Sequence, residues 1–263
     1  MQIKYYGYNT FIIKSKNKII AIDPGADLYF FRLKSLIPKK EWKNITHIFV
    51  THGDPDHHWY TDRVAKTSNA KVICNKTMVR EKNGINLMLG PRDKGLSFTK
   101  SIKNLHTISV NETIELDGIR IKGIKATHGP VTFKIGPFSK TLNVGTNERM
   151  GWGAIGFKIN IDEKIIVNLG DTLLNKSEWK MIGDTDVLMI PIGGKIPHNT
   201  MDESEALKAV DIIKPKVVIP CHYNCPALFS NNYNPADDKM FKEEVENKGI
   251  KCTILERGES FNF

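Results

Sequence analysis

Short apolar stretches, bounded by turn residues, dominate the first part of the sequence. They lie at 3–7, 10–14, 18–25 and 46–52, and the third ends at Asp23-Pro24-Gly25. Runs of this length rich in isoleucine, valine and aromatic residues predict adjacent strands of a sheet. Residues 59–71 then have a helical pattern, and 71–74 return as a buried strand.

The second half contains another β-rich block. Strands are predicted at 105–110, 112–116, 119–128, 153–159, 164–172, 186–194, 216–224 and 251–256, with Asp117-Gly118 as a hairpin turn. One helix is predicted near 201–213, after a capping box that begins at Thr200. Another is predicted from Asn234-Pro235 to about Gly249. The lysine-rich segment 82–103, interrupted by glycines and a proline, predicts a long loop with room for a helical piece. The composition of this segment is compatible with a lid over an active site and with a solvated surface loop.

This order of elements predicts an α/β protein in which two β-sheets pack face to face with helices outside. The length of 263 residues fits one domain over 1–263, since layered α/β folds often reach about 250 residues as a unit. A chain of this size buries roughly three quarters of its unfolded surface. It therefore needs no disulfide or structural metal in order to fold.

Net charge, the length of apolar runs and the number of cysteines limit the class of protein to which the chain can belong. The surplus of Lys and Arg gives a formal charge of +9, which attracts anions without specifying them, so phosphorylated substrates and nucleic acid stay open. No apolar run reaches the roughly 18 to 20 residues of a membrane span. The four cysteines form no CxxC pair, and Met1 leads directly into a strand-like segment. We therefore expect a cytoplasmic protein.

The most informative segment runs from His52 to His58 and places five potential metal ligands within seven residues, directly after a predicted strand. Side chains of His and Asp that leave one tight loop can converge on a small volume, and together they suit divalent first-row metals. An Asp/Pro turn with solvated histidines is the alternative for this segment alone.

Three further strand ends each present one ligand-type side chain. They are His128 in Ala-Thr-His-Gly, Asp171 in Leu-Gly-Asp-Thr, and His222 in Ile-Pro-Cys-His-Tyr. Each is weak by itself, because a lone strand-end histidine is usually structural and Gly-Asp-Thr is an ordinary turn. Their order after the first segment predicts one metal site built from several strands.

These motifs resemble the metallo-β-lactamase superfamily, whose strand ends carry an Asp, then HxHxDH, then a His, an Asp and a His. The resemblance covers nearly the whole chain and implies a four-layer αββα metallo-β-lactamase sandwich, with two facing mixed sheets and helices outside. Residues 191–194, 200–206 and 214–223 are similar to the group that includes ascorbate-6-phosphate lactonase. That narrower likeness says little about the substrate.

The resemblance implies two divalent metal ions. It assigns the ligands of the first metal to His52, Asp54 and His128, those of the second to Asp56, His57 and His222, and the bridge to Asp171. Asp54 stands where the family has a histidine, which makes the first site more anionic. Zinc is favoured, because it binds both histidine and carboxylate ligands. The additional carboxylate makes manganese and ferrous iron more favourable than they would be with a histidine at this position. A first site that binds metal weakly or not at all is the alternative.

The implied function is a metal-dependent hydrolase that uses a metal-bridging hydroxide on an ester, lactone or phosphodiester. Asp56 and Asp171 are the catalytic candidates within the ligand set, and His198, in a Gly/Pro-rich loop, is a candidate proton donor or a solvent-exposed histidine. Asp23 would orient a ligand histidine from behind, or merely cap a turn.

A small anionic substrate is favoured, and its candidate contacts are Lys134, Lys140, Arg149 and Tyr223, each of which has a solvated or packing role as the alternative. The competing functions are a metal-dependent nuclease acting on RNA or DNA, and a non-catalytic metal-binding module. An Arg-rich arm and a concentrated basic stripe are both missing from the sequence, so nucleic acid is the less favoured partner. The sequence leaves the oligomeric state open.

Overall fold

The computed structural model describes residues 1–30, 32–93, 96–135, 138–142, 151–196, 198–228 and 230–263, with the backbone alone for 82, 87–93, 96–100, 131–135, 138–142, 227–228 and 230–231. Two large sheets form its centre. The first has the strand order β11 (Leu105–Ile108), β7 (Lys71–Asn75), β6 (His47–Val50), β3 (Lys18–Ile22), β2 (Phe11–Ser15), β1 (Gln2–Tyr5), β23 (Ser260–Asn262). The second has the order β12 (Thr113–Leu116), β13 (Ile119–Lys125), β16 (Ile155–Ile161), β17 (Lys164–Asn168), β18 (Val187–Pro191), β19 (Val217–Cys221), β22 (Lys251–Cys252).

Both sheets are mixed. In the first, β1, β2 and β3 are antiparallel, whereas β3, β6, β7 and β11 are parallel. In the second, β12, β13, β16 and β17 are antiparallel, and β17, β18, β19 and β22 are parallel. The parallel strands end at the same edge of each sheet, so the loops that follow them gather at one end of the molecule.

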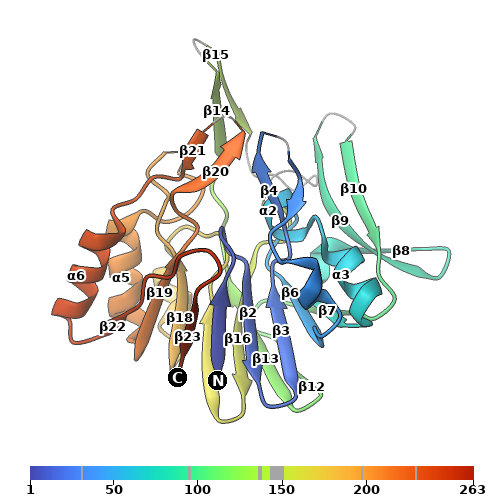
Figure 1. Cartoon of the computed structure of the whole chain (residues 1–263), viewed down its shortest axis with the longest axis horizontal. Helices are drawn as coiled ribbons and strands as arrows, with labels where there is room; N and C mark the ends of the chain where they lie inside the picture. The colour runs from blue at the N-terminus through green and yellow to red at the C-terminus, as the bar shows by residue number, and fades with distance from the viewer. Residues whose placement is uncertain (31, 94–95, 136–137, 143–150, 197, 229) are drawn as a thin grey trace.

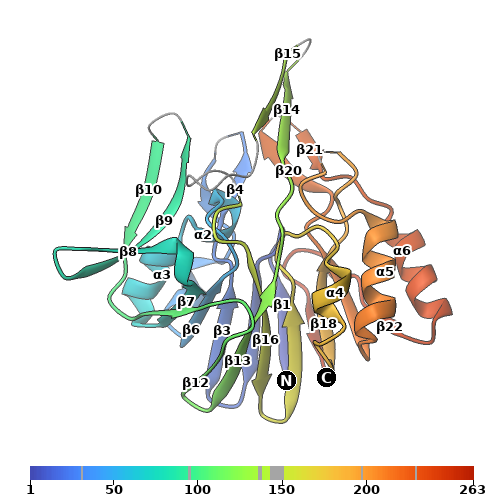
Figure 2. The same ribbon diagram turned by 180° about the vertical axis from the view of Figure 1, so that it is seen from behind.

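Helices cover the outer faces of the two sheets (Figures 1 and 2). The first sheet is covered by α1 (Lys39–Trp42), α3 (Thr61–Ser68) and the 3₁₀ turn η1 (Lys76–Met78), and the second by α4 (Lys176–Trp179), α5 (Glu203–Ile213) and α6 (Asp238–Asn247). The short α2 (Pro55–His58) lies among the loops at the strand ends. The predicted αββα sandwich is confirmed. A single domain over 1–263 stays a prediction.

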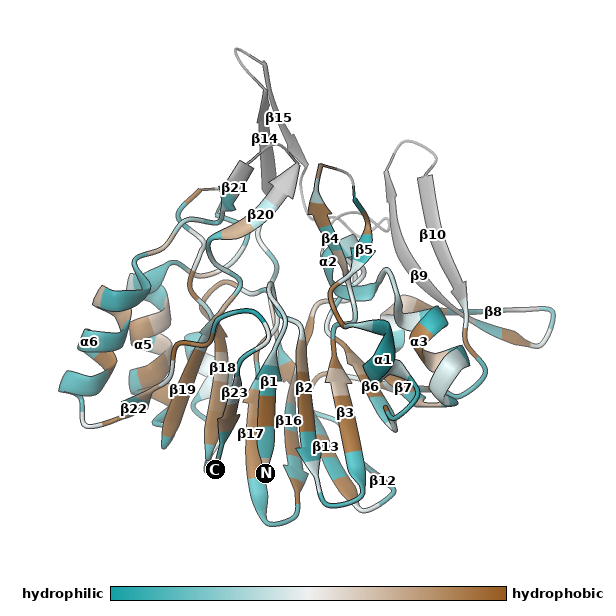
Figure 3. Cartoon of the chain, viewed as in Figure 1, coloured by the Kyte–Doolittle hydropathy of each residue, from teal (hydrophilic) through white to brown (hydrophobic). Residues whose placement is uncertain are grey.

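Successive side chains on each strand point to opposite faces of the sheet, and this alternation explains why each sheet is packed between helices and the other sheet. On β2, Phe11 and Ile13 enter the cluster between the sheets, whereas Ile12 packs under the helices of the first sheet. On β18, Met189 faces the inner cluster and Leu188 faces the helices of the second sheet. Each such buried side chain contributes about 1.5–3 kcal/mol. The strands accordingly carry most of the hydrophobic colouring in Figure 3, while the surface helix α6 is largely hydrophilic.

Three smaller β structures rise beyond the sheets at the end where the parallel strands terminate (Figure 1). They are β8 (Val79–Lys82), β9 (Ile85–Asp93) and β10 (Leu96–Ser101); the hairpin of β14 (Val131–Ile135) and β15 (Phe138–Leu142); and the set β21 (Ser230–Tyr233), β20 (Cys225–Leu228), β4 (Ala26–Tyr29) and β5 (Lys34–Ser35).

Several local predictions are confirmed and three are wrong. Asp117 and Gly118 form the two-residue turn between β12 and β13, both with positive φ, as a type I′ hairpin requires. The segment 82–103 was predicted as a loop. It instead contains β9, β10 and the end of β8, because β9 pairs with β8 on one side and with β10 on the other. The cap of α5 is Asp202, not Thr200, and α6 starts after Asp237 rather than at Asn234-Pro235.

None of the helices among the described residues is long and apolar enough to cross a bilayer.

Candidate metal centre

Four strand ends and α2 bring the predicted ligands together. His52 and Asp54 follow β6, and α2 carries Asp56 and His57. The other three follow β13, β17 and β19 and are His128, Asp171 and His222. All seven side chains are buried. Because the sheets pack face to face, the ends of β6, β13, β17 and β19 converge although they are far apart in sequence.

The first group consists of His52, Asp54 and His128. Oδ2 of Asp54 lies 3.5 Å from Nε2 of His52 and 3.6 Å from Nε2 of His128. The other carboxylate oxygen, Oδ1, accepts a hydrogen bond of 2.7 Å from the backbone N–H of Gly151. This contact fixes the carboxylate with one oxygen turned toward the two imidazoles, so the three side chains form a group that could hold a metal ion.

Gly151 also supports the ring of His128. Its φ is +72°, and a Cβ at this position would lie 2.4 Å from Cγ of His128. A side chain here would push the imidazole away from Asp54. Gly151 was not singled out in the sequence, because its role depends on a contact with a residue 23 positions earlier.

The second group consists of Asp56, His57 and His222. Oδ2 of Asp56 lies 3.3 Å from Nε2 of His57 and 3.3 Å from Nε2 of His222. Each group offers ligand atoms that all lie within 4.8 Å of one another. The arrangement matches the two ligand sets that the family resemblance implies.

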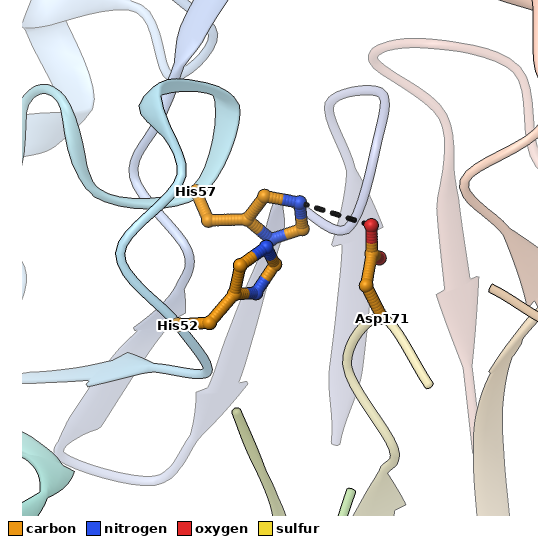
Figure 4. A group of neighbouring side chains, drawn as sticks. All are labelled: His52, His57 and Asp171. Atoms are coloured by element: carbon orange, nitrogen blue, oxygen red, sulfur yellow. Dashed lines mark ion pairs between the residues drawn. The ribbon is translucent and has the colours of Figure 1, made fainter. Parts of the chain in front are cut away.

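Asp171 lies between the two groups. Its Oδ2 is 3.0 Å from Nε2 of His222 and 3.6 Å from Nε2 of His57, both in the second group, and 3.8 Å from Nε2 of His128 in the first. Figure 4 shows its carboxylate facing the rings of His52 and His57. A carboxylate has two oxygens, so this position allows Asp171 to contact ions in both groups.

The site has the properties that bound cations require. Nε2 of His52, Nε2 of His57 and Oδ1 of Asp171 are buried and have no hydrogen-bond partner among the described residues. Buried polar atoms are rarely left without a partner. Imidazole nitrogens and carboxylate oxygens in one small volume are a ligand set for divalent first-row metals. The residues present therefore fit bound divalent cations.

Asp23 holds one ligand from behind. Its Oδ2 accepts hydrogen bonds from Nδ1 of His57 at 2.7 Å, from Oγ1 of Thr51 at 2.6 Å and from Nδ2 of Asn9 at 2.6 Å, and its Oδ1 accepts from the backbone N–H of Thr51. With Nδ1–H donated to Asp23, the Nε2 lone pair of His57 is directed at the ligand group. The structure thus puts Asp23 where the resemblance implies.

Asn234 stands behind His222 in the same way, and sequence reasoning missed it. Its side-chain amide lies 2.8 Å from Nδ1 of His222, while its Oδ1 is buried without a partner among the described residues. The oxygen and nitrogen of an amide exchange places by a half turn. With Oδ1 toward the ring, Asn234 accepts the Nδ1–H of His222 and leaves Nε2 free to bind a metal. The predicted helix cap instead lies behind the imidazole of His222 and can orient it.

The carboxylates and imidazoles perturb each other strongly. Burial alone raises the pKa of a carboxyl group, but His222 and His57 outweigh it and hold the pKa of Asp171 well below its usual range. Burial likewise disfavours a charged imidazole, yet Asp171 and Asp56 raise the pKa of His222 to about 9. Without a metal, the second group therefore holds protons that an entering cation must displace.

His128 in the first group behaves differently, because burial outweighs the two carboxylates that lie near it, Asp54 and Asp171. Burial lowers the pKa of His128, and Asp54 restores only part of it. A neutral imidazole at neutral pH can bind a metal without first releasing a proton.

Tyr233, on β21, was not among the predicted site residues. Burial raises the pKa of its hydroxyl well above the usual range, and the charges of Asp56, Asp171 and Asp54 raise it further. The strand places Tyr233 opposite Cys225 and directly before Asn234. Its phenol therefore stays protonated, within the electrostatic influence of all three carboxylates.

The remaining predicted residues fall outside the ligand group. Nε2 of His198 lies 2.9 Å from Oε2 of Glu205, and its side chain is 52% exposed, so its role as proton donor stays a prediction. The hydroxyl of Tyr223 donates to Asp238 on α6 at 3.1 Å, which supports its alternative as a packing residue.

The cationic candidates Lys134, Lys140 and Arg149 stay predictions too. Lys134 and Lys140 lie on the paired strands β14 and β15, which begin three residues after His128, but their side chains are outside the described part of the structure. Arg149 lies outside the described residues altogether.

Comparisons with known proteins place this architecture in a family. The model of the beta-lactamase superfamily domain matches residues 2–222. A UPF0173 metal-dependent hydrolase of Nanoarchaeum equitans is 32% identical over 267 residues, covering 100% of both chains. Another, from Pyrococcus abyssi, is 30% identical over 263 residues, covering 98% of each.

The same architecture occurs in a solved structure. Igni18, a metallo hydrolase from Ignicoccus hospitalis, aligns over 100% of this chain and 98% of its own with a TM-score of 0.69 and 24% identity. At that identity the likeness shows the shared fold.

Proposed function

We propose that the chain, which belongs to the β-lactamase superfamily and within it to the UPF0173 metal-dependent hydrolases, is a two-metal hydrolase of a small anionic ester, lactone or phosphodiester. The observation that carries the proposal is the convergence of seven buried ligand side chains in two groups that Asp171 joins.

The chain's own residues would hold the two ions. His52, Asp54 and His128 would bind one, Asp56, His57 and His222 the other, and Asp171 would contact both. Zinc suits these ligands, and the carboxylate-rich composition keeps manganese and ferrous iron open. When bound, two such ions supply a water made acidic near neutral pH and positive charge beside the oxygen of the attacked carbonyl or phosphoryl group.

Supporting residues then have separate tasks. Asp23 and Asn234 keep Nε2 of His57 and of His222 directed at the second site. We assign to Asp56, which the resemblance makes both a ligand and a catalytic residue, the proton released by the attacking water. Tyr233, whose hydroxyl stays protonated under the electrostatic influence of the three carboxylates, is our candidate to donate a hydrogen bond to the oxygen of the substrate that becomes negative.

The position of the β14–β15 hairpin supports the preference for an anionic substrate. The β14–β15 hairpin, which contains Lys134 and Lys140, projects beyond the sheets at the end where the ligand-bearing strands terminate (Figure 1). Cations on such a hairpin would attract a carboxylate or phosphate toward the site.

An activity panel tests the proposal. The zinc-loaded and manganese-loaded proteins are assayed on a lactone, a phosphodiester and an RNA oligonucleotide, with Asp171→Ala as the control variant that should lose activity. We expect hydrolysis of at least one small anionic substrate, lost in the variant and after chelation. Cleavage of RNA alone would establish the nuclease alternative. Two bound metals without turnover of any substrate would favour the non-catalytic module.

A further inference from the structure

A second feature of the molecule lies on the outer face of the second sheet, at the part that the helices leave uncovered. On β13 and β16 the inward side chains, such as Ile121 and Ile159, enter the core between the sheets. The outward side chain of Ile124 packs under the helices of that sheet. Beyond Ile124, toward the start of β13, the outward positions change to Lys122 and Arg120, so the sheet no longer presents an apolar face to a helix.

The uncovered face is hollowed. A cavity of about 320 Å³ is lined by cations and polar groups from three adjacent strands and by the connection that follows α4. Its lining comprises Arg120, Lys122 and Lys158, with Asn160 and Thr113 beside them. The side chains of Ile165, Met181 and Ile182 form an apolar wall. Met181 is 66% exposed, which is unusual for a large apolar side chain.

Among the described residues, two cations of this cavity, Arg120 and Lys122, lack the ion-pair partners that some other surface cations have. Lys71 pairs with Asp117 at 2.7 Å and Lys216 with Asp186 at 2.8 Å. Within the part of the chain that the structure describes, Arg120 and Lys122 form no ion pair, although Glu115 lies opposite Arg120 in the register of β12 and β13. No carboxylate is among the described residues that line the cavity.

The three cations are also close enough to repel one another. The ammonium of Lys158 donates a hydrogen bond to the carbonyl of Ile182, which holds it at the cavity wall. Burial lowers the pKa of Lys158; Asp184 counteracts this, and the charges of Lys122 and Arg120 lower the pKa further. Like charges gathered around a hollow are stabilised when an anion enters it.

We propose that this cavity, formed by Arg120, Lys122 and Lys158 on the outer face of β13 and β16, is a binding site for a small phosphomonoester. A guanidinium fork beside two ammonium groups recognises the oxygens of a phosphate dianion, and Asn160 and Thr113 add neutral donors. The wall of Met181 and Ile182 receives the short organic part. A volume near the lower end of the range of ligand pockets suits a small molecule and not a polymer.

The site is separate from the metal centre. Arg120 lies at the start of β13, whereas His128 follows the other end of the same strand. Ligand binding here therefore does not depend on the proposed hydrolase function, and a failure of one does not imply a failure of the other.

Chemical-shift mapping tests the proposal on the metal-loaded full chain. Sodium phosphate and glycerol phosphate are titrated in separate samples against backbone amide spectra, with sodium chloride at equal ionic strength as reference. We expect saturable shifts at Arg120, Lys122, Lys158 and Ile182. In the double variant Arg120→Ala/Lys122→Ala the affinity should fall at least about tenfold, since charge-assisted hydrogen bonds are lost. The matched variant Lys39→Ala/Lys43→Ala, which removes two exposed lysines from the other side of the sandwich, should bind as wild type.

Three results would overturn the proposal. Shifts confined to the loops of His128 and Asp171 would show that phosphate binds only the metals. Equal affinity in the two double variants would show non-specific attraction to the net charge. Tighter binding of a single-stranded oligonucleotide than of either phosphate, lost in Arg120→Ala/Lys122→Ala, would show that the cavity is part of a nucleic-acid surface.

Discussion

Removal of the Asp54 carboxylate should disable one metal site and spare the other. Asp54 supplies one of three ligand side chains in the first group, at 3.5 and 3.6 Å from the Nε2 atoms of its histidines. Loss of a partner behind a ligand typically weakens metal binding by about 10- to 100-fold, and loss of the ligand itself should exceed that range. We therefore expect Asp54→Ala to weaken binding of one ion by at least about 100-fold.

The fold should survive this change. Asp54→Ala leaves the N–H of Gly151 without its acceptor, which costs about 1–3 kcal/mol. It also removes a buried carboxylate that His52 and His128 favour more than Asp56 disfavours it, since the pKa of Asp54 lies below its usual range. Both effects are destabilising and of modest size, so the melting temperature of the metal-free variant should fall by several degrees.

Competition with a chromophoric chelator measures both affinities. Asp54→Ala should retain one tight ion, and Asp56→Ala, the matched change in the second group, should also retain one. Asp54→His should retain two and shift preference toward zinc. Two equally tight ions in Asp54→Ala would refute the assignment of Asp54 as a ligand.

Three other predictions concern catalysis and protons. Asp171→Ala should lower both kcat and metal content, with Asp171→Asn between it and wild type; a folded Asp171→Ala protein with two metals and normal turnover would contradict the bridge. Tyr233→Phe should lower kcat about tenfold or more with metal content unchanged, whereas Tyr223→Phe should change kcat little; equal kinetics in the two variants would exclude the proposed donor. Because the pKa of His222 is raised to about 9 from an ordinary value near 6.5, its proton stabilises the metal-free fold below about pH 6.5, and this stability is lost as pH rises through about 9. Metal affinity should accordingly increase with pH up to about 9, with proton release seen by calorimetry in buffers of different ionisation enthalpy; a flat profile would disagree.

The grouping of the candidate ligands could be predicted from the sequence because the segments that carry them follow strands with a clear apolar signal. His52, His128, Asp171 and His222 stand at the ends of runs that alternate or stay apolar, and strand ends meet at one edge of a layered fold. The residue types, histidine and aspartate, then indicated a site for divalent metal ions. Asp54 is unusual by its position alone, because it stands where the family motif has a histidine.

Asn234 and Gly151, which contact the candidate ligands from behind, could not be predicted in the same way. Asn234 contacts His222 only because β20 and β21 fold back as a pair, so a residue that the sequence marks as a helix cap lies behind an imidazole. Gly151 matters because its backbone passes close to His128 and donates to Asp54. Both depend on long-range register, which a local pattern does not encode.

The misassigned segment 82–103 has a related cause. Glycines and lysines favour a loop when each residue is judged by itself, but β9 pairs with β8 on one side and β10 on the other. Tertiary pairing overrides weak strand propensity there.

The content of bound metal tests the central claim most directly. Protein purified after expression with zinc or manganese should contain close to two divalent ions per chain by elemental analysis, and diffraction at the metal absorption edge should place one between His52, Asp54 and His128 and the other between Asp56, His57 and His222. A reproducible content near zero, or ions bound elsewhere, would contradict the account.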